Sequence, residues 1–298
     1  MTLSTLIVLF AVSAQPDLAW KQQDGQLALA RGEKVVWQLH CKKEDGKPYL
    51  HPVSIGETVV TDFRPADHFW HKALWFSWKT INGVLYWEED PKTGKSPGET
   101  EVVGSKLEPR PDFSARCELQ ISYHPPGKPA VLTERRILEM TPPAADGSFT
   151  IDWVSTFTAG ETEVLLDRTP IAGEPGGVAW GGYAGLSFRL NPALKTWQYI
   201  DSQGKVPERA KNAKWIAFSG PLAGKSGAIV VLDHPSNPRH PSPWYLIPEM
   251  PYFSPAVLYR EPMKLAAGKS FTLKYRIRFQ AAAVDPAAVD KQWEEFAK

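Results

Sequence analysis

Apolar and polar residues alternate over several long stretches of the chain. Between residues 270 and 280 every second side chain is apolar and the others are polar or charged, and similar alternation runs through 115–124 and 149–157. Successive side chains of a β-strand point to opposite faces, so each stretch predicts an antiparallel strand with one buried and one solvated face. Shorter candidate strands are 35–39, 131–140, 183–190, 214–219 and 228–233.

The C-terminal end of the chain follows a helical period instead. Asp285 is suited to cap a helix that has Pro286 at its first position. Val289, Trp293 and Phe296 then recur at helical spacing. The sequence therefore predicts a short C-terminal helix that packs on the sheets.

Turn-forming residues are frequent throughout the chain, which has 27 Pro, 22 Gly and 12 Trp in 298 residues. Turns between aromatic and β-branched runs are typical of many short strands. The candidate strands are spread evenly, and neither an internal repeat nor a Ser/Gly linker separates them. We therefore expect residues 15–298 to form one all-β domain, a large antiparallel β-sandwich.

The charge of the chain is balanced, with 34 basic and 33 acidic residues and a net charge of +1. Neither sign forms a long block. A nucleic-acid-binding protein or a membrane-surface protein typically carries a strongly basic patch. We therefore expect no nucleic-acid partner.

The N-terminal residues 1–14 have the pattern of a signal peptide: an apolar run is followed by small residues at 12–14, although no Lys or Arg precedes it. This predicts export to the periplasm or the extracellular space. A buried strand, or a start codon placed slightly late, is the alternative. No other segment is apolar and long enough to span a membrane. Cys41 and Cys117 fit either one disulfide in an oxidising compartment or two buried thiols.

The densest group of candidate functional residues lies between residues 62 and 78 and comprises Asp67, His68, His71 and Lys72 among Trp70, Trp75 and Trp78. Histidines three positions apart share one side in a turn or helix but not in an extended strand. Imidazoles transfer protons near neutral pH, and indole faces stack on the C–H face of a sugar ring. The group predicts a binding or catalytic site; the alternative is a tryptophan-rich core edge with two satisfied histidines.

A second group follows the apolar strand 228–232 and contains Asp233, His234, Asn237 and Trp244. Prolines repeat between these residues and fix the backbone, which lowers the entropy cost of an ordered loop. The group is consistent with a functional loop at the rim of a sheet. It is equally consistent with a rigid turn in which Asp233 and Asn237 bond locally to the backbone.

A third feature is a charged residue on a face that should be buried. In 131–140 the apolar face also carries Glu134 and Arg136. Such charges must either pair or lie in a cleft. Glu134 is therefore either the partner of Arg136 or a general base or acid in a pocket, with Arg189 nearby.

Cofactor motifs are weak or missing in this sequence. His68-x-x-His71 with a distant Asp or His is a possible set of metal ligands, but it lacks the stronger His-Glu-x-x-His pattern. No glycine-rich nucleotide loop and no Gly-x-Ser-x-Gly elbow occurs. We therefore expect no nucleotide cofactor and no serine-hydrolase chemistry, and a divalent metal stays possible.

Several motifs together resemble a bacterial family. They are Tyr49-Leu50-His51-Pro52, 67–72, Trp75, Asn82-Gly83, 183–189, 213–215, 233–238 and, near the C-terminus, 265–270 with Tyr275-Arg276. This series resembles the family labelled "methane oxygenase PmoA-like", which is of largely unknown function and common in organisms that degrade plant and algal polysaccharides. The resemblance covers nearly the whole chain after residue 14. A methane monooxygenase subunit is a bundle of membrane-spanning helices, so the label itself does not fit this chain.

The resemblance implies a galactose-mutarotase-like supersandwich, a fold of sugar epimerases and some polysaccharide lyases. Such enzymes use a His and a Glu or Asp in a shallow cleft. By this analogy, His68 or His71 would be the acid, and Glu134 or Asp233 the base. The chain departs from the family pattern at Trp70, where a second histidine is expected; that change would harm a metal site more than a stacking site.

These observations lead to one leading hypothesis and two alternatives. The leading hypothesis is an exported enzyme that acts on a carbohydrate by proton transfer, as an epimerase, mutarotase or lyase does. The alternatives are a non-catalytic carbohydrate-binding module and a metal-dependent glycoside-processing hydrolase. The expected substrate-binding residues are His51, Trp70, Lys72, Trp75, Arg189, His234, Asn237 and Trp244.

Overall fold

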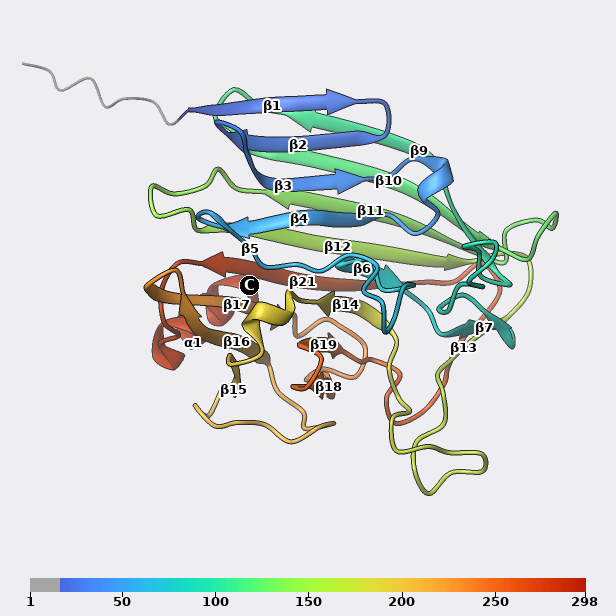
Figure 1. The fold of residues 1–298 in the computed structure, drawn as a ribbon. Coiled ribbons are helices and arrows are strands. Elements are labelled where there is room, and N and C mark those ends of the chain that lie inside the picture. The colour runs from blue at the N-terminus through green and yellow to red at the C-terminus, as the bar shows by residue number, and fades with distance from the viewer. Residues whose placement is uncertain (1–16) are drawn as a thin grey trace, which may run out of the picture.

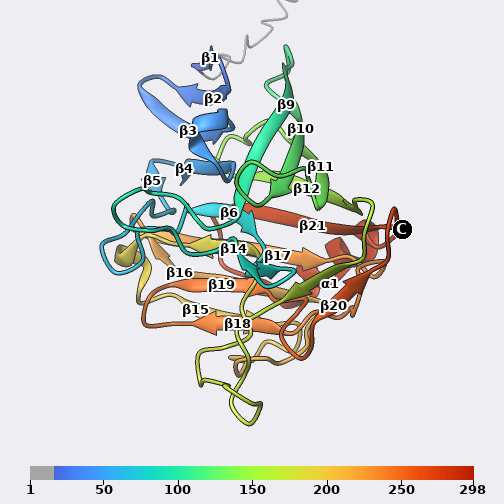
Figure 2. The same cartoon turned by 90° about the vertical axis from the view of Figure 1, so that its right-hand side faces the viewer.

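The computed structural model describes residues 17–298, so the predicted signal peptide at 1–14 lies outside the described residues. The chain forms two large antiparallel sheets packed face to face, a small third sheet and a C-terminal helix (Figures 1 and 2). This confirms the predicted all-β sandwich with a short C-terminal helix. Across residues 17–298, no helix has the length and apolar character needed to cross a membrane.

The first sheet joins the N-terminal strands to strands from the second half of the chain (Figure 1). In spatial order it contains β1 (Leu18–Gln23), β2 (Gln26–Arg31), β3 (Lys34–His40), β4 (Tyr49–Ile55), β6 (Leu74–Ser77), β14 (Gly185–Arg189), β19 (Tyr252–Pro255) and β18 (Trp244–Ile247), with β5 (Thr58–Val59) paired to β4. A short 3₁₀ turn, η1 (Lys43–Asp45), lies between β3 and β4.

The second sheet forms the other layer of the sandwich (Figure 2). In spatial order it contains β15 (Gln198–Asp201), β16 (Trp215–Leu222), β17 (Lys225–Asp233), β21 (Ser270–Gln280), β12 (Phe149–Ala159), β11 (Leu132–Met140), β10 (Ala115–His124) and β9 (Glu99–Pro109). The small third sheet is β20 (Met263–Leu265), β13 (Val164–Asp167), β7 (Thr80–Ile81) and β8 (Val84–Leu85), and η2 (Pro192–Leu194) precedes β15. All eight strands predicted from alternation are present.

The main hydrophobic core lies between the two large sheets. In β12 the inward residues Phe149, Ile151, Trp153 and Phe157 are buried, as their alternation predicts. Cys41 and Cys117 are both buried as free thiols, and Cys117 belongs to the inward face of β10. The alternative of two buried thiols therefore describes the structure, and the disulfide is not formed.

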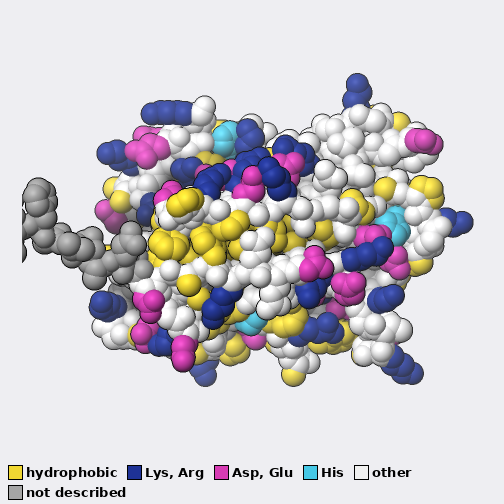
Figure 3. Space-filling view, turned by 90° about the horizontal axis from the view of Figure 1, so that it is seen from above, with side chains coloured by type: hydrophobic (Ala, Val, Ile, Leu, Met, Phe, Trp, Pro, Cys, Tyr) yellow, Lys and Arg dark blue, Asp and Glu magenta, His cyan; other side chains and the backbone are white. Residues whose placement is uncertain are grey.

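The two sheets meet at an open edge between β1 and β9. Figure 3 looks onto this edge and shows hydrophobic side chains between bands of charged ones. Trp20 of β1 crosses the edge: its ring packs against Trp37 and Phe113, and its Nε1 donates to the Arg110 carbonyl at 3.1 Å. These contacts tie the first strand to the opposite sheet.

Helix α1 (Pro286–Phe296) covers the outer face of the second sheet. Asp285 caps it as predicted, since its side chain accepts a hydrogen bond from Ala287 N. Val289 is buried against β16 and β17, and Trp293 packs in the same cluster. The helix therefore shields apolar strand residues that alternation alone would leave exposed.

The helix contact predicts the effect of one substitution. Val289→Asp places a charge in this apolar contact, so we expect the free energy of unfolding to fall by at least about 3 kcal/mol. Ala288→Asp, at an exposed position of the same helix, should change it by less than about 0.5 kcal/mol. Urea unfolding followed by circular dichroism measures both values. Equal effects of the two variants would mean that the helix does not pack on the sheet.

Candidate functional site

The outer face of the first sheet carries a second apolar cluster instead of a solvated surface. In β18, Trp244 and Leu246 point into the main core, while Tyr245 and Ile247 point outward. The outward cluster contains Tyr49, Trp75, Trp87, Tyr245, Tyr252 and Ala256. Because both faces of this sheet are apolar, loops must cover the outer one.

The covering loops leave a cavity of about 440 Å³, which we call the aromatic cavity. Its aromatic walls are Trp70, Trp87, Trp180, Tyr183, Tyr245 and Tyr252. Its titratable side chains are His68, His71 and Glu88. Trp75 lies directly beneath, with its ring centroid 5.1 Å from that of His71. This combination of apolar walls and a few polar groups is typical of a small-molecule site.

The two cavity histidines lie on a tight turn, as their spacing predicts. His68 N donates to the Pro65 carbonyl at 3.1 Å, and His71 N donates to the His68 carbonyl at 2.8 Å. The imidazole rings stack with centroids 4.7 Å apart, and the other face of the His71 ring lies 5.3 Å from Tyr252. The turn therefore brings both imidazoles to one side.

His71 is a neutral imidazole at pH 7. Burial, and after it the neighbouring His68 and Arg189, holds the pKa of His71 well below its usual 6.5. A neutral imidazole has one donor and one acceptor nitrogen. Its Nδ1 is buried and has no hydrogen-bond partner among residues 17–298. His71 therefore has unused hydrogen-bonding capacity beside the cavity.

Arg189 positions His68 rather than lining the cavity itself. Its Nη2 donates to both carboxylate oxygens of Asp67, each at 2.8 Å. Asp67 Oδ2 in turn lies 3.0 Å from His68 Nδ1. Although burial alone would raise the pKa of Asp67, Arg189 and His68 lower it. The expected group of Asp67, His68 and His71 is thus assembled, with Arg189 behind it.

Glu88 is the carboxylate of the cavity, and sequence reasoning did not select it. Its Oε1 accepts hydrogen bonds from Lys79 Nζ and, at 2.9 Å, from Tyr183 Oη. Lys79 also donates to Tyr183 Oη at 2.8 Å. Oε2 of Glu88 is buried without a partner in the described part of the chain. The one sequence signal was a run of three acidic residues, Glu88-Glu89-Asp90, directly after Tyr86-Trp87.

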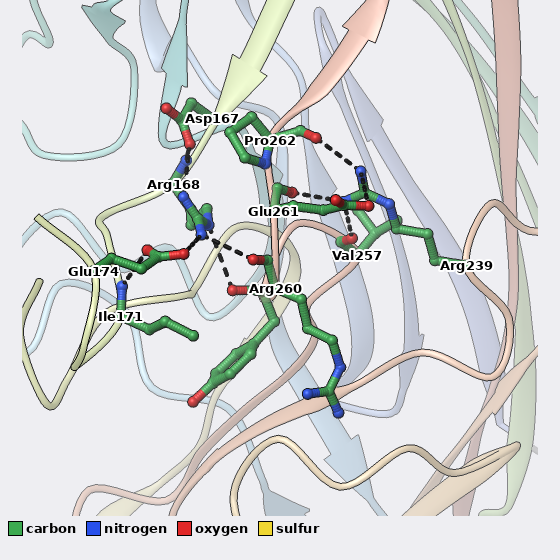
Figure 4. A network of polar contacts seen from close by, with 10 residues as sticks. Asp167, Arg168, Ile171, Glu174, Arg239, Val257, Arg260, Glu261 and Pro262 are labelled. Carbon is green, nitrogen blue, oxygen red and sulfur yellow. Dashed lines mark hydrogen bonds and ion pairs between the residues drawn. The ribbon is translucent and has the colours of Figure 1, made fainter.

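The loop 168–183 forms one rim of the aromatic cavity and carries Trp180, whose side chain is 54% exposed. Figure 4 shows how Arg168 braces it: the guanidinium contacts the carboxylates of Asp167 and Glu174 and the Arg260 carbonyl. Glu174 also accepts from Ile171 N at 2.9 Å. These contacts hold the rim loop in one conformation.

The second group of predicted residues lies elsewhere. Asp233 is buried and accepts hydrogen bonds from Asn237 Nδ2 at 2.7 Å, His240 Nδ1 at 2.8 Å and Ser242 N at 2.8 Å. His234 packs against Phe296 of α1, with ring centroids 5.0 Å apart. The loop therefore braces β17 against α1. This corrects the expectations that Asp233 is the base that acts with His68 or His71, and that His234 and Asn237 bind the substrate, because none of the three lines the aromatic cavity.

Two other residues near that loop have structural roles. Trp244 is fully buried in the main core, where its Nε1 donates to the Ala213 carbonyl at 2.9 Å. Arg239 donates to the carbonyls of Val257, Glu261 and Pro262 (Figure 4). Trp244 therefore does not hold a ligand ring, because it points away from the cavity side of β18.

Glu134 is the partner of Arg136 inside the sandwich. Arg136 donates to both of its oxygens, at 2.7 and 2.9 Å. Tyr123 Oη and Ser155 Oγ also donate to it. Glu134 is 2% exposed. The ion-pair alternative therefore describes Glu134, and the expectation of a carboxylate in a pocket beside Arg189 is corrected.

The two remaining predicted residues lie beside the cavity but not in it. His51 Nδ1 is 2.9 Å from Thr61 Oγ1, and its ring stacks on Phe63. Burial, followed by the charge of His40, lowers the pKa of His51 to about 4. Lys72 lines a separate hollow on the far side of His71. Within residues 17–298, no group of three or more His, Cys, Asp or Glu is placed to hold a metal ion.

Comparison with known proteins gives a family and no function. A model of a protein family matches residues 26–294, and its description is "Family of unknown function (DUF6807)". No curated protein matches the chain.

The depressed pKa of His71 predicts a pH dependence of stability. In the unfolded chain His71 protonates below about pH 6.5, whereas in the folded chain it stays neutral to lower pH. Wild type therefore loses stability on acidification, at about 1.4 kcal/mol per pH unit for this group. The His71→Phe variant lacks the imidazole, so its free energy of unfolding should not fall in this way. Below pH 6.5 that free energy should therefore rise relative to the value for wild type. A stability difference that does not change with pH would contradict the neutral imidazole.

The buried ion pair predicts an asymmetric cost of two substitutions. Glu134→Ala leaves Arg136 buried and unpaired, so the free energy of unfolding should fall by about 3–5 kcal/mol. Glu118→Ala removes the partner of Arg135, which is 54% exposed, and should cost less than about 1 kcal/mol. Urea unfolding measures both. Similar small losses in the two variants would show that Glu134 is not part of the core.

Proposed function

We propose that this chain, which belongs to the DUF6807 family of unknown function, binds a sugar or sugar derivative in the aromatic cavity and catalyses a proton transfer on it. One observation carries the proposal. Four buried polar atoms around the cavity, His68 Nδ1, His71 Nδ1, Trp70 Nε1 and Glu88 Oε2, make no hydrogen bond among residues 17–298. Such atoms cost free energy unless water or a ligand satisfies them.

The walls of the cavity suit a sugar ring. Aromatic faces stack on the C–H face of a pyranose, while its hydroxyl groups need polar partners at the ring edge. Trp180 and Tyr183 stack at the rim with centroids 6.3 Å apart, and Glu88 and His71 supply the polar edge. A volume of about 440 Å³ lies within the usual range for small-molecule sites.

The polar groups also suit proton transfer. Glu88 is held by Lys79 and Tyr183 through one oxygen, which leaves the other free to accept a proton from a substrate hydroxyl or C–H group. His68, whose Nδ1 lies 3.0 Å from Asp67 Oδ2, would return a proton as the acid. Neutral His71, which stacks on His68, exchanges hydrogen bonds with the same hydroxyl. Glu88 thus takes the role that the sequence suggested for Glu134 or Asp233.

The resemblance of the motifs to a galactose-mutarotase-like sandwich supports the same class of reaction, an epimerisation, mutarotation or elimination. The export predicted from residues 1–14 is compatible with a sugar substrate. Fold analogy alone does not define a reaction, so the proposal rests on the cavity.

Sugar binding is tested first. Melting temperature is measured against a panel of neutral monosaccharides and short oligosaccharides, because a ligand that binds the folded state raises it in a concentration-dependent way. Trp180→Ala should weaken the best ligand by roughly tenfold through lost stacking. Trp20→Ala, at the β1–β9 edge away from the cavity, should leave affinity unchanged. If no sugar shifts the melting temperature, or if both variants lose affinity equally, the proposed site is wrong.

Catalysis is tested with Glu88→Gln, which keeps the shape of the side chain. With the sugar found in the screen, nuclear magnetic resonance follows anomer exchange and deuterium uptake from solvent. We expect Glu88→Gln to lower turnover by at least about 100-fold while affinity stays within a few-fold of wild type. Binding without turnover in wild type would instead favour a carbohydrate-binding module.

A further inference from the structure

A second hollow of about 420 Å³, which we call the polar cavity, adjoins the aromatic cavity. Two short segments, 71–72 and 88–89, lie between the two cavities. In each segment one residue lines one cavity and the next residue lines the other. His71 lines the aromatic cavity and Lys72 the polar one, and Glu88 and Glu89 divide in the same way. The two cavities therefore share one wall.

The base of the polar cavity holds more positive than negative charge. Lys47 and Lys72 are 4% and 5% exposed, and Glu89 is the buried carboxylate between them. Glu89 Oε1 lies 3.1 Å from Lys47 Nζ and 3.7 Å from Lys72 Nζ. Arg64 Nη1 approaches Glu89 Oε2 to 3.7 Å from the partly exposed rim. These three cations lie around one buried carboxylate. The rest of the lining adds Lys43, Lys95 and the carboxylates of Glu44, Asp45, Glu99 and Glu101, so the cavity as a whole has balanced charge and the excess positive charge is confined to its buried base.

Lys72 retains unused donors in this cavity. Lys47 Nζ donates three hydrogen bonds, to the Trp87 carbonyl, Glu89 Oε1 and Ser96 Oγ, which uses all of its N–H groups. Lys72 Nζ, in contrast, donates one hydrogen bond, to the Asp45 carbonyl at 2.6 Å, and lies 3.7 Å from Glu89 Oε1. An ammonium group has three donors, so Lys72 has capacity left for a ligand oxygen.

The charge of the buried base is not fully compensated, because Lys47 and Lys72 are both buried and Glu89 is the one buried carboxylate of the lining. Burial lowers the pKa of Lys47 to about 8. Burial also lowers the pKa of Lys72, and the positive charge of Arg64 lowers it further. Buried charges are stable in proteins when they are paired. An anion in the polar cavity would supply the missing negative charge.

We propose that the polar cavity binds an oxyanion, a carboxylate, sulfate or phosphate group, through Lys72 and Arg64 with Lys47 behind them. The ring of Tyr49 lies 5.5 Å from Lys72 Nζ and forms an apolar side of the same cavity. This anion site does not depend on the proposed function of the aromatic cavity. A free ion or the acidic group of a sugar that reaches across the shared wall would satisfy it; the second source rests on the proposed function.

The anion site is tested with sodium sulfate on the full chain. Calorimetry and melting temperature are compared with sodium chloride at equal ionic strength, and we expect a saturable effect of sulfate. Lys72→Met should weaken sulfate at least tenfold, and Arg64→Gln, at a partly exposed position, should weaken it too. Lys128→Met, an exposed lysine in the turn after β10, is the matched control for charge and should have no effect. Chloride and sulfate acting alike, or Lys72→Met and Lys128→Met acting alike, would overturn the site.

A second comparison distinguishes the source of the anion. If one acidic sugar fills both cavities, glucuronate should bind at least tenfold tighter than glucose, and Lys72→Met should remove that advantage. If sulfate binds but glucuronate has no advantage over glucose, the site takes a free anion. If neither sugar binds while sulfate still depends on Lys72, the proposed sugar function fails and the anion site stands.

Discussion

The constraint on which this structure depends is that part of the first sheet, at β4, β6, β18 and β19, carries apolar side chains on both faces. Its inner face packs in the sandwich core, while its outer face presents Trp75, Tyr245 and Tyr252. Exposed aromatic surface of this extent is unfavourable in water, so loops from 62–73, 86–89 and 168–183 pack over it. The aromatic cavity is the part of that surface that the loops do not fill.

The same constraint explains why the polar groups of the site are buried. A loop that covers an apolar face brings its own side chains into low dielectric, where they must be paired. Arg189 pairs with Asp67, and Lys79 with Glu88. The pairing leaves particular atoms without a hydrogen-bond partner, and under the proposed function those atoms bind the sugar. The wall shared with the polar cavity is made of the same covering segments.

Local pattern predicts the fold better than it predicts the site. Alternation gives β21 with its observed bounds, and capping gives α1, since both depend on neighbours in sequence. The turn at His68 and His71 is local as well. The choice between a site and a structural pair at Glu134 or Asp233 depends on strands and helices distant in sequence. Glu88 was missed because its partner Tyr183 lies 95 residues away, and a single buried carboxylate has no periodic signal.

The most direct test of the account is a crystal structure with the best-binding sugar soaked into the protein. The account predicts a ring packed against the aromatic walls, with hydroxyl oxygens within hydrogen-bond distance of Glu88 Oε2 and His71 Nδ1. A sugar bound on another face would contradict it. So would an aromatic cavity closed by a direct contact between Glu88 and His71.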